Sequence, residues 1–205
     1  MARHLILFVF TLFFSVLCHA KANETFNEAS TLLHRISAAK VRPYSTRDFG
    51  REQFSGAISV LVSEEKAEKI LLAVRKELPP GFVAFIGTTR SLTTPPAVGV
   101  ELVIGRGTGP LDVLDVAQTD AINYGMTTRK LKGRFARWHK AFGIDIWQAE
   151  TDTVQLRFQK MPRDLKSFAK EVYKFCPDIV DQGVGTEEAL LKDIQNTKGL
   201  YLWWD

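Results

Sequence analysis

The chain contains little cysteine and little histidine, and this scarcity limits the kinds of site it can hold. Its 205 residues include 2 cysteines and 4 histidines. Cys18 lies in an apolar N-terminal segment, so a chain processed after that segment would keep only Cys176 and form no internal disulfide. Zinc sites need cysteines and histidines at set spacings, and the sequence has no H-E-x-x-H or paired-histidine pattern. We therefore expect no metal centre and no cofactor.

Long hydrophobic runs are also missing. The longest uncharged apolar run, from Leu5 to Leu17, has about 13 residues, whereas a membrane-spanning helix needs about 20. Arg3 precedes this run and small residues follow it, which is typical of a secretory signal peptide cleaved after Ala20 or Ala22. An uncleaved membrane anchor and a lipoprotein are the alternatives. The sequence thus predicts a periplasmic or secreted bacterial protein without a transmembrane helix.

The net charge is modest, but one segment lacks acidic residues altogether. The chain has 27 basic and 23 acidic residues, a balance that favours solubility and argues against a nucleic-acid partner. No acidic residue lies between Asp120 and Asp145. At helical spacing the basic residues of this segment lie opposite its apolar stripe. This face is predicted either to bind an anionic protein, glycan or lipid headgroup, or to be merely solvated; its residues are Arg129, Lys130, Arg137 and Lys140.

Hydrophobic periodicity predicts an α+β fold. We expect a mostly antiparallel sheet with helices packed on one face and a short N-terminal helical extension. The predicted organisation is a signal peptide over 1–20, an N-terminal helix and connector over 23–56, and a single α+β domain over 57–205. Apolar strand patterns occur at 57–62, 82–87, 98–104, 144–150, 153–159 and 200–205. Helical patterns occur at 26–40, 64–78, 127–142, from Pro162 onward, and from a Thr186 cap to Asn196.

Several short motifs follow one another in the second half of the chain. They are Asn123-Tyr124-Gly125, Trp138 with Phe142-Gly143, Phe175-Cys176-Pro177-Asp178 and Trp203-Trp204-Asp205. In this order they resemble the bacterial domain family of unknown function numbered 4253, over roughly residues 98–205. The resemblance implies an α+β domain and supplies no activity, substrate or catalytic residue.

The aromatic stretch at the end of the chain offers a second candidate binding site. Because side chains alternate along a strand, Tyr201, Trp203 and Asp205 are predicted to share one face. Two aromatic rings and a carboxylate there could form a ligand groove for apolar or sugar contacts. The alternative is that these rings simply pack in the core.

Candidate catalytic residues are few. Cys176 could act as a nucleophile with His139 as base and Asp178 as orienting carboxylate, although a packed thiol beside a turn explains the same residues. Asp178 could also join Asp181 and Asp205 around a hard cation. With no complete catalytic motif, the sequence favours a non-enzymatic binding or interaction domain of the cell envelope. A thiol-dependent enzyme or hydrolase using Cys176 is the alternative.

Overall fold

The structure, a computed structural model, describes residues 26–45, 54–89 and 94–205. The predicted signal peptide therefore lies outside the described residues, as does part of the predicted connector. Among the described helices, none is both long enough and apolar enough to cross a membrane.

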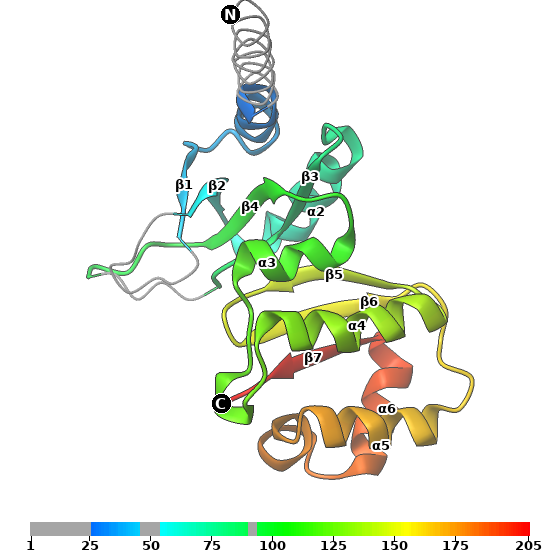
Figure 1. Cartoon of the computed structure of the whole chain (residues 1–205). Helices are drawn as coiled ribbons and strands as arrows, with labels where there is room; N and C mark the ends of the chain where they lie inside the picture. The colour runs from blue at the N-terminus through cyan, green and yellow to red at the C-terminus, as the bar shows by residue number, and fades with distance from the viewer. Residues whose placement is uncertain (1–25, 46–53, 90–93) are drawn as a thin grey trace, which may run out of the picture.

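The described strands form one seven-stranded sheet in the order β1-β2-β4-β3-β5-β6-β7 (Figure 1). Neighbouring strands run antiparallel except β3 and β5, which are parallel and are paired only at Ile86 and Gln148. The predicted α+β class with a mostly antiparallel sheet is confirmed. The strands are β1 (Arg42–Tyr44), β2 (Phe54–Val62), β3 (Phe82–Ile86), β4 (Val100–Arg106), β5 (Ile144–Ala149), β6 (Thr153–Phe158) and β7 (Gly199–Trp203).

Helices cover both faces of the sheet in its N-terminal half, which differs from the expected packing on one face. The cause is that β3 and β4 carry apolar residues at consecutive positions, so both of their faces must be buried. One face packs against α2 (Glu64–Glu77) and a helix over residues 26–37, which contributes the buried Ala29 and Leu33. The other face packs against α3 (Val113–Ala117). The N-terminal helix is therefore part of a core.

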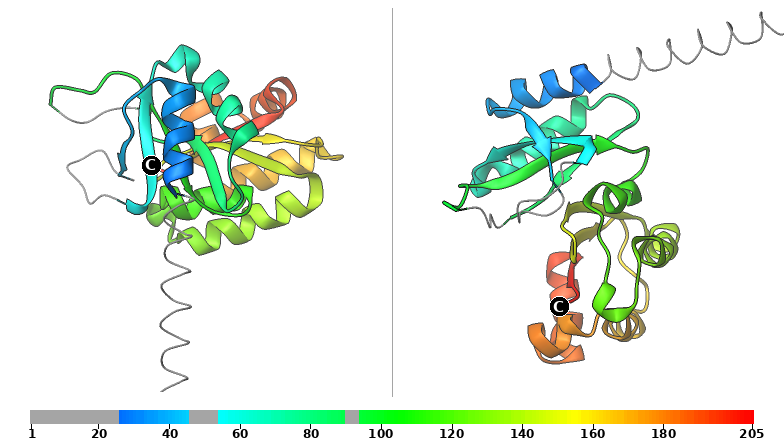
Figure 2. Two further views of the ribbon diagram at one scale, coloured as in Figure 1. Left: turned by 90° about the horizontal axis from the view of Figure 1, so that it is seen from above. Right: turned by 60° about the vertical axis from the view of Figure 1, so that its left-hand side comes forward.

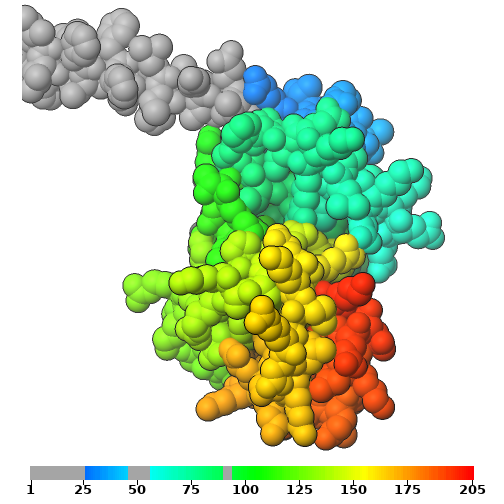
Figure 3. Space-filling view, turned by 90° about the vertical axis from the view of Figure 1, so that its right-hand side faces the viewer, coloured from blue at the N-terminus to red at the C-terminus, as the bar shows by residue number. Residues whose placement is uncertain are grey.

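The C-terminal half of the sheet is covered by helices on one face. There β5, β6 and β7 bury alternate residues against α4 (Thr128–Phe142), α5 (Leu165–Phe175) and α6 (Glu187–Thr197). Aromatic rings meet edge to face in this core, with Trp138 5.4 Å from Phe175 and Phe175 5.4 Å from Trp204. Figures 2 and 3 show this half at the opposite end of the molecule from the N-terminal helix.

The helix caps were mostly predictable. Thr127 and Thr186 cap α4 and α6, and their hydroxyls accept from the backbone N–H groups of Lys130 and Ala189. Ser63 occupies the N-cap position of α2 without a side-chain capping bond. The start predicted at Pro162 is displaced, because Asp164 caps α5 by accepting from the Ser167 N–H at 2.9 Å.

Five short elements of the described residues were not predicted. They are β1, the 3₁₀ turn η1 (Pro110–Asp112), the helix α3 that follows it, the 3₁₀ turn η2 (Ile122–Tyr124) and the π-helical turn η3 (Ile179–Val184). Each is six residues or shorter, so it carries too little periodicity to be recognised in a sequence.

Arg75 of α2 connects the two halves of the sheet at the junction of β3 and β5. Its Nε donates to the Ala84 carbonyl oxygen at 2.8 Å and its Nη2 to the Ile146 carbonyl oxygen at 2.7 Å. Its Nη1 lies 2.9 Å from both carboxylate oxygens of Asp145. β3 and β5 are paired only at Ile86 and Gln148, and Ala84 and Ile146 lie two residues before that pair on their strands. Where β3 and β5 separate, the Arg75 guanidinium therefore bonds to both strands in place of the hydrogen bonds that would join them directly.

Candidate functional site

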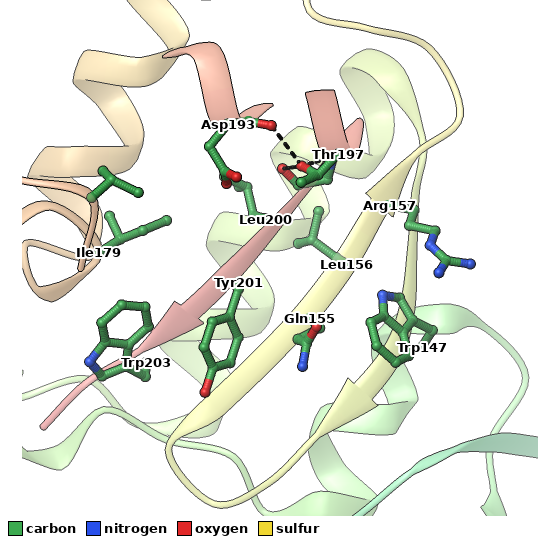
Figure 4. A pocket seen from close by; sticks show the side chains of 12 residues that line it. Trp147, Gln155, Leu156, Arg157, Ile179, Asp193, Thr197, Leu200, Tyr201 and Trp203 are labelled. Atoms are coloured by element: carbon green, nitrogen blue, oxygen red, sulfur yellow. Dashed lines mark hydrogen bonds between the residues drawn. The ribbon is translucent and has the colours of Figure 1, made fainter. Parts of the chain in front are cut away.

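The face of β5, β6 and β7 that lies opposite α4 carries a pocket. Strand alternation sends Ile146, Leu156 and Leu202 toward the helices, and the intervening residues to the other side. The pocket has a volume of about 410 Å³. Figure 4 shows its floor, formed by side chains from three adjacent strands, and its rim, formed by η3 and α6. The principal side chains are Trp147, Gln155, Arg157, Ile179, Asp193, Tyr201 and Trp203.

Two aromatic residues of β7 form one end of the pocket. The rings of Tyr201 and Trp203 lie 5.1 Å apart and are tilted by 37°. Tyr201 is 48% exposed, whereas Trp203 is half-buried against η3. A Cβ atom at Gly183 of η3 would lie 2.7 Å from Cη2 of Trp203, so glycine leaves the space that this ring occupies. The sequence-based prediction of Tyr201 and Trp203 on one face agrees with this arrangement.

Trp147 forms the other end. The pairing of β5 with β6 shifts register between Ile146 and Gln148, and Trp147 is the additional residue at this bulge. The guanidinium of Arg157 lies 5.1 Å from the centre of the Trp147 ring, and its Nη1 donates to Glu68 of α2 at 2.6 Å. This bond is the main reason that the pKa of Glu68 is lowered. The Arg157 guanidinium is thus held in a fixed position beside the indole.

Several polar groups of the pocket are unpaired. Among the described residues, neither the Gln155 amide nor the Asp193 carboxylate forms a side-chain hydrogen bond or ion pair, and the indole N–H groups of Trp147 and Trp203 are likewise without a partner. Thr197 is already bonded, because its hydroxyl donates to the Asp193 carbonyl oxygen at 2.9 Å. The pocket therefore combines aromatic surface with unused donors and acceptors.

Asp205 does not join Tyr201 and Trp203 in the pocket, contrary to the sequence-based prediction. β7 ends at Trp203, so the alternation does not extend to Asp205. The backbone N–H of Asp205 instead donates to Oδ2 of Asp178 at 3.0 Å. Asp178 is buried, and its Oδ1 also accepts from the Tyr124 hydroxyl at 2.6 Å. This bond is the main cause that raises the pKa of Tyr124 to about 12.

Three of the four motifs that carry the family resemblance meet around this carboxylate. Besides the bonds to Asp178, the Trp204 indole N–H donates to the Phe175 carbonyl oxygen at 3.3 Å. The Cys176 thiol donates to the Trp203 carbonyl oxygen at 2.9 Å. Motifs far apart in the sequence thus bond to one another, and the contacts they make are those of a structural junction.

The residues of the thiol-enzyme alternative are not joined to one another. Cys176 is fully buried, and burial is the main cause that raises the pKa of its thiol to about 12. Nδ1 of His139 lies 3.1 Å from both the backbone N and the carbonyl O of Ile144, and no hydrogen bond links His139 to Cys176 or Asp178. Among the described residues, no group of three or more His, Cys, Asp or Glu side chains is placed to hold a metal ion.

We expect Cys176 to resist iodoacetamide at pH 8 in the folded protein and to react fully after unfolding in urea. The reason is that the thiolate is the nucleophile and the folded thiol stays protonated. Mass spectrometry of the Cys176 peptide measures the labelling. Rapid native labelling would contradict this account.

The same thiol should make stability depend on pH. Above pH 9 the Cys176 thiol loses its proton in the unfolded chain before it does so in the folded protein. The free energy of unfolding should therefore fall as the pH rises from 9 toward 12, and less steeply in Cys176→Ala.

The predicted basic face of α4 is exposed. Arg129, Arg137 and Lys140 form no hydrogen bond or ion pair within the described part of the chain. Lys130 is also exposed, and its Nζ donates to the Gly125 carbonyl oxygen at 2.9 Å. This face lies across the sheet from the pocket, because α4 packs on the opposite side of β5 and β6 (Figure 1).

The fold and pocket define an α+β protein with a solvent-accessible aromatic pocket on its sheet. A family model described as "Domain of unknown function (DUF4253)" matches residues 102–205, about half of the chain. The chain belongs to this family, and the predicted resemblance is confirmed. A search of the curated proteins and a search of the solved structures each found no match. The matched region contains both the pocket and α4.

Proposed function

We propose that this protein is an exported, non-enzymatic binding protein that takes a neutral oligosaccharide in the pocket of β5, β6 and β7. The observation that carries the proposal is the combination of solvent-facing, partly exposed aromatic rings with unpaired polar groups at one sheet face. Export is inferred from the signal-like segment that ends at Ala20 or Ala22. Ligand sites typically combine apolar and aromatic surface with a few placed polar groups.

The chemistry of a saccharide fits this combination. Sugar rings present C–H faces that pack against aromatic rings, and hydroxyl groups that both donate and accept hydrogen bonds. Tyr201 and Trp203 supply ring surface at one end and Trp147 at the other. Gln155 lies between them and offers a donor and an acceptor, and Asp193 on α6 at the rim offers two acceptor oxygens (Figure 4). The aromatic residues lie on different strands, so an extended ligand of more than one sugar would contact both ends.

The thiol-enzyme alternative has less support. A nucleophilic cysteine needs access to substrate and a lowered pKa, whereas Cys176 is buried and the pKa of its thiol is raised. In addition, Cys176 lies on the helix-covered side of the structure and its thiol is occupied by the Trp203 carbonyl oxygen. These observations favour binding over thiol catalysis.

Titration calorimetry with cellotetraose, maltotetraose and chitotetraose tests the proposal. We expect one of these probes to bind, and Trp203→Ala to weaken that binding at least about tenfold because it removes a stacking surface. Leu72→Ala is the matched control, since Leu72 is 55% exposed on α2 outside the pocket. Failure of all three probes to bind, or equal binding by Trp203→Ala, would overturn the proposal.

A further inference from the structure

We propose that the exposed stripe of α4 formed by Arg129, Arg137 and Lys140, here called the basic stripe, binds a linear anionic polysaccharide. This interaction is separate from the proposed pocket ligand, because the basic stripe and the pocket lie on opposite sides of the sheet. The carboxylate or sulfate groups of the polysaccharide would be the groups that the basic stripe recognises.

The basic stripe is confined to one side of α4. At 1.5 Å and 100° per residue, its three cations span roughly 16 Å of helix within about 80° of its circumference. Gly133 and Ala136 lie between them and are exposed, and a Cβ atom at Gly133 would meet nothing within 4 Å. No long side chain therefore interrupts the stripe, and a chain-like ligand has room to lie along it.

Two of the cations beside the basic stripe, Lys132 and Arg134, are paired with carboxylates. On the side of α3, Lys132 pairs with Asp112 at 3.0 Å and also with Asp115. On the side of α5, Arg134 pairs with Glu171 at 2.7 Å. Asp115 and Glu171 remain partly exposed, so a planar anionic membrane that covered this region would also meet carboxylates. A ligand only as wide as the helix avoids them, which favours a single polyanionic chain over a membrane.

The composition of this face argues against two other partners. The exposed residues of α4 are arginine, lysine, glycine and alanine, with no aromatic or large aliphatic side chain. Protein interfaces derive most of their affinity from such anchors, and single-stranded nucleic acids are held by stacking on aromatic rings. An anionic polysaccharide requires only charge and planar guanidinium forks, which Arg129 and Arg137 provide.

Fluorescence anisotropy with labelled dextran sulfate, and with uncharged labelled dextran of the same length, tests this assignment. We expect dextran sulfate to bind at low salt. The triple variant Arg129→Gln, Arg137→Gln, Lys140→Gln should raise its dissociation constant about tenfold or more, and should reduce the slope of log affinity against log salt by about 2. Trp203→Ala should retain this binding, which separates it from the pocket.

The control triple variant is Lys166→Gln, Lys170→Gln, Lys174→Gln on α5. It removes the same number of positive charges from exposed, regularly spaced positions on a helix. Lys166 and Lys170, however, line a hollow together with the acidic Glu187 and Glu188. We expect it to bind dextran sulfate nearly as well as the unaltered protein, with circular dichroism showing that both variants are folded. Equal loss in the two variants, or no loss in either, would overturn the assignment. Stripe-dependent binding to anionic vesicles or poly-glutamate without binding to dextran sulfate would overturn it too.

Discussion

Replacing Trp204 by alanine should lower the free energy of unfolding by about 3–5 kcal/mol, the usual cost of removing a fully buried large aromatic side chain. Trp204 is 2% exposed, and its ring lies 5.4 Å from that of Phe175. Its indole N–H also donates to the Phe175 carbonyl oxygen, which would be left without this partner. Urea denaturation followed by circular dichroism measures the loss.

The neighbouring Trp203, the last residue of β7, is the matched control, because it is the same residue type with its ring on the opposite side of the sheet. Its ring is half-buried beside Gly183, at the edge of the pocket. We expect Trp203→Ala to cost about 1–2 kcal/mol, because less apolar surface leaves contact with the protein. Binding in the pocket, by contrast, should be weakened at least about tenfold in Trp203→Ala. Equal destabilisation by the two variants would contradict the placement of Trp204 in the core and of Trp203 at the pocket.

The separation of these two tryptophans was predictable from the sequence. Strand alternation alone places Leu200, Leu202 and Trp204 on one face and Tyr201 and Trp203 on the other. The burial pattern follows this division. Alternation could not predict where the strand ends, and for that reason Asp205 was assigned to the pocket although it bonds to Asp178.

The other end of the pocket was not predicted. Trp147, Gln155 and Arg157 lie on strands whose ranges were recognised, and their alternation with Ile146 and Leu156 is visible in the sequence. What the sequence does not show is that β6 pairs with both β5 and β7, which brings these residues beside Tyr201. Asp193 was also missed, because it belongs to a helix that reaches the pocket only through tertiary packing.

The family motifs are explained by contacts that no single segment reveals. Asn123-Tyr124-Gly125 was recognised as a motif, but the bond of Tyr124 to Asp178 joins residues 54 positions apart. The lone Cys176 stands out in the sequence as a candidate nucleophile, whereas its buried position makes it part of the same junction. The contacts around Asp178 hold β7 in place at the edge of the sheet, and β7 in turn supplies Tyr201 and Trp203 to the pocket.

Replacing Arg75 by methionine should lower the free energy of unfolding by about 2–4 kcal/mol, because two carbonyl oxygens and a carboxylate lose a charged donor. The Arg75 side chain is 23% exposed, so solvent screens part of the pair with Asp145 and lowers its contribution to stability. Arg75→Lys should recover less than half of the loss, since an ammonium lacks the planar fork that reaches both strands. Thermal and urea unfolding measure both variants.

Arg35→Met is the matched control for this substitution. Arg35 pairs with Glu77 at 2.7 Å, but both side chains are more than half exposed, so its loss should cost less than about 1 kcal/mol. A similar small cost for Arg75→Met would contradict the role assigned to Arg75 at the junction of β3 and β5. A large cost would support that role, since only one residue pair connects β3 and β5 directly. The family match begins at Leu102 in β4, so it covers β5 and most of β4 but not β3, the strand that lies between them in the sheet.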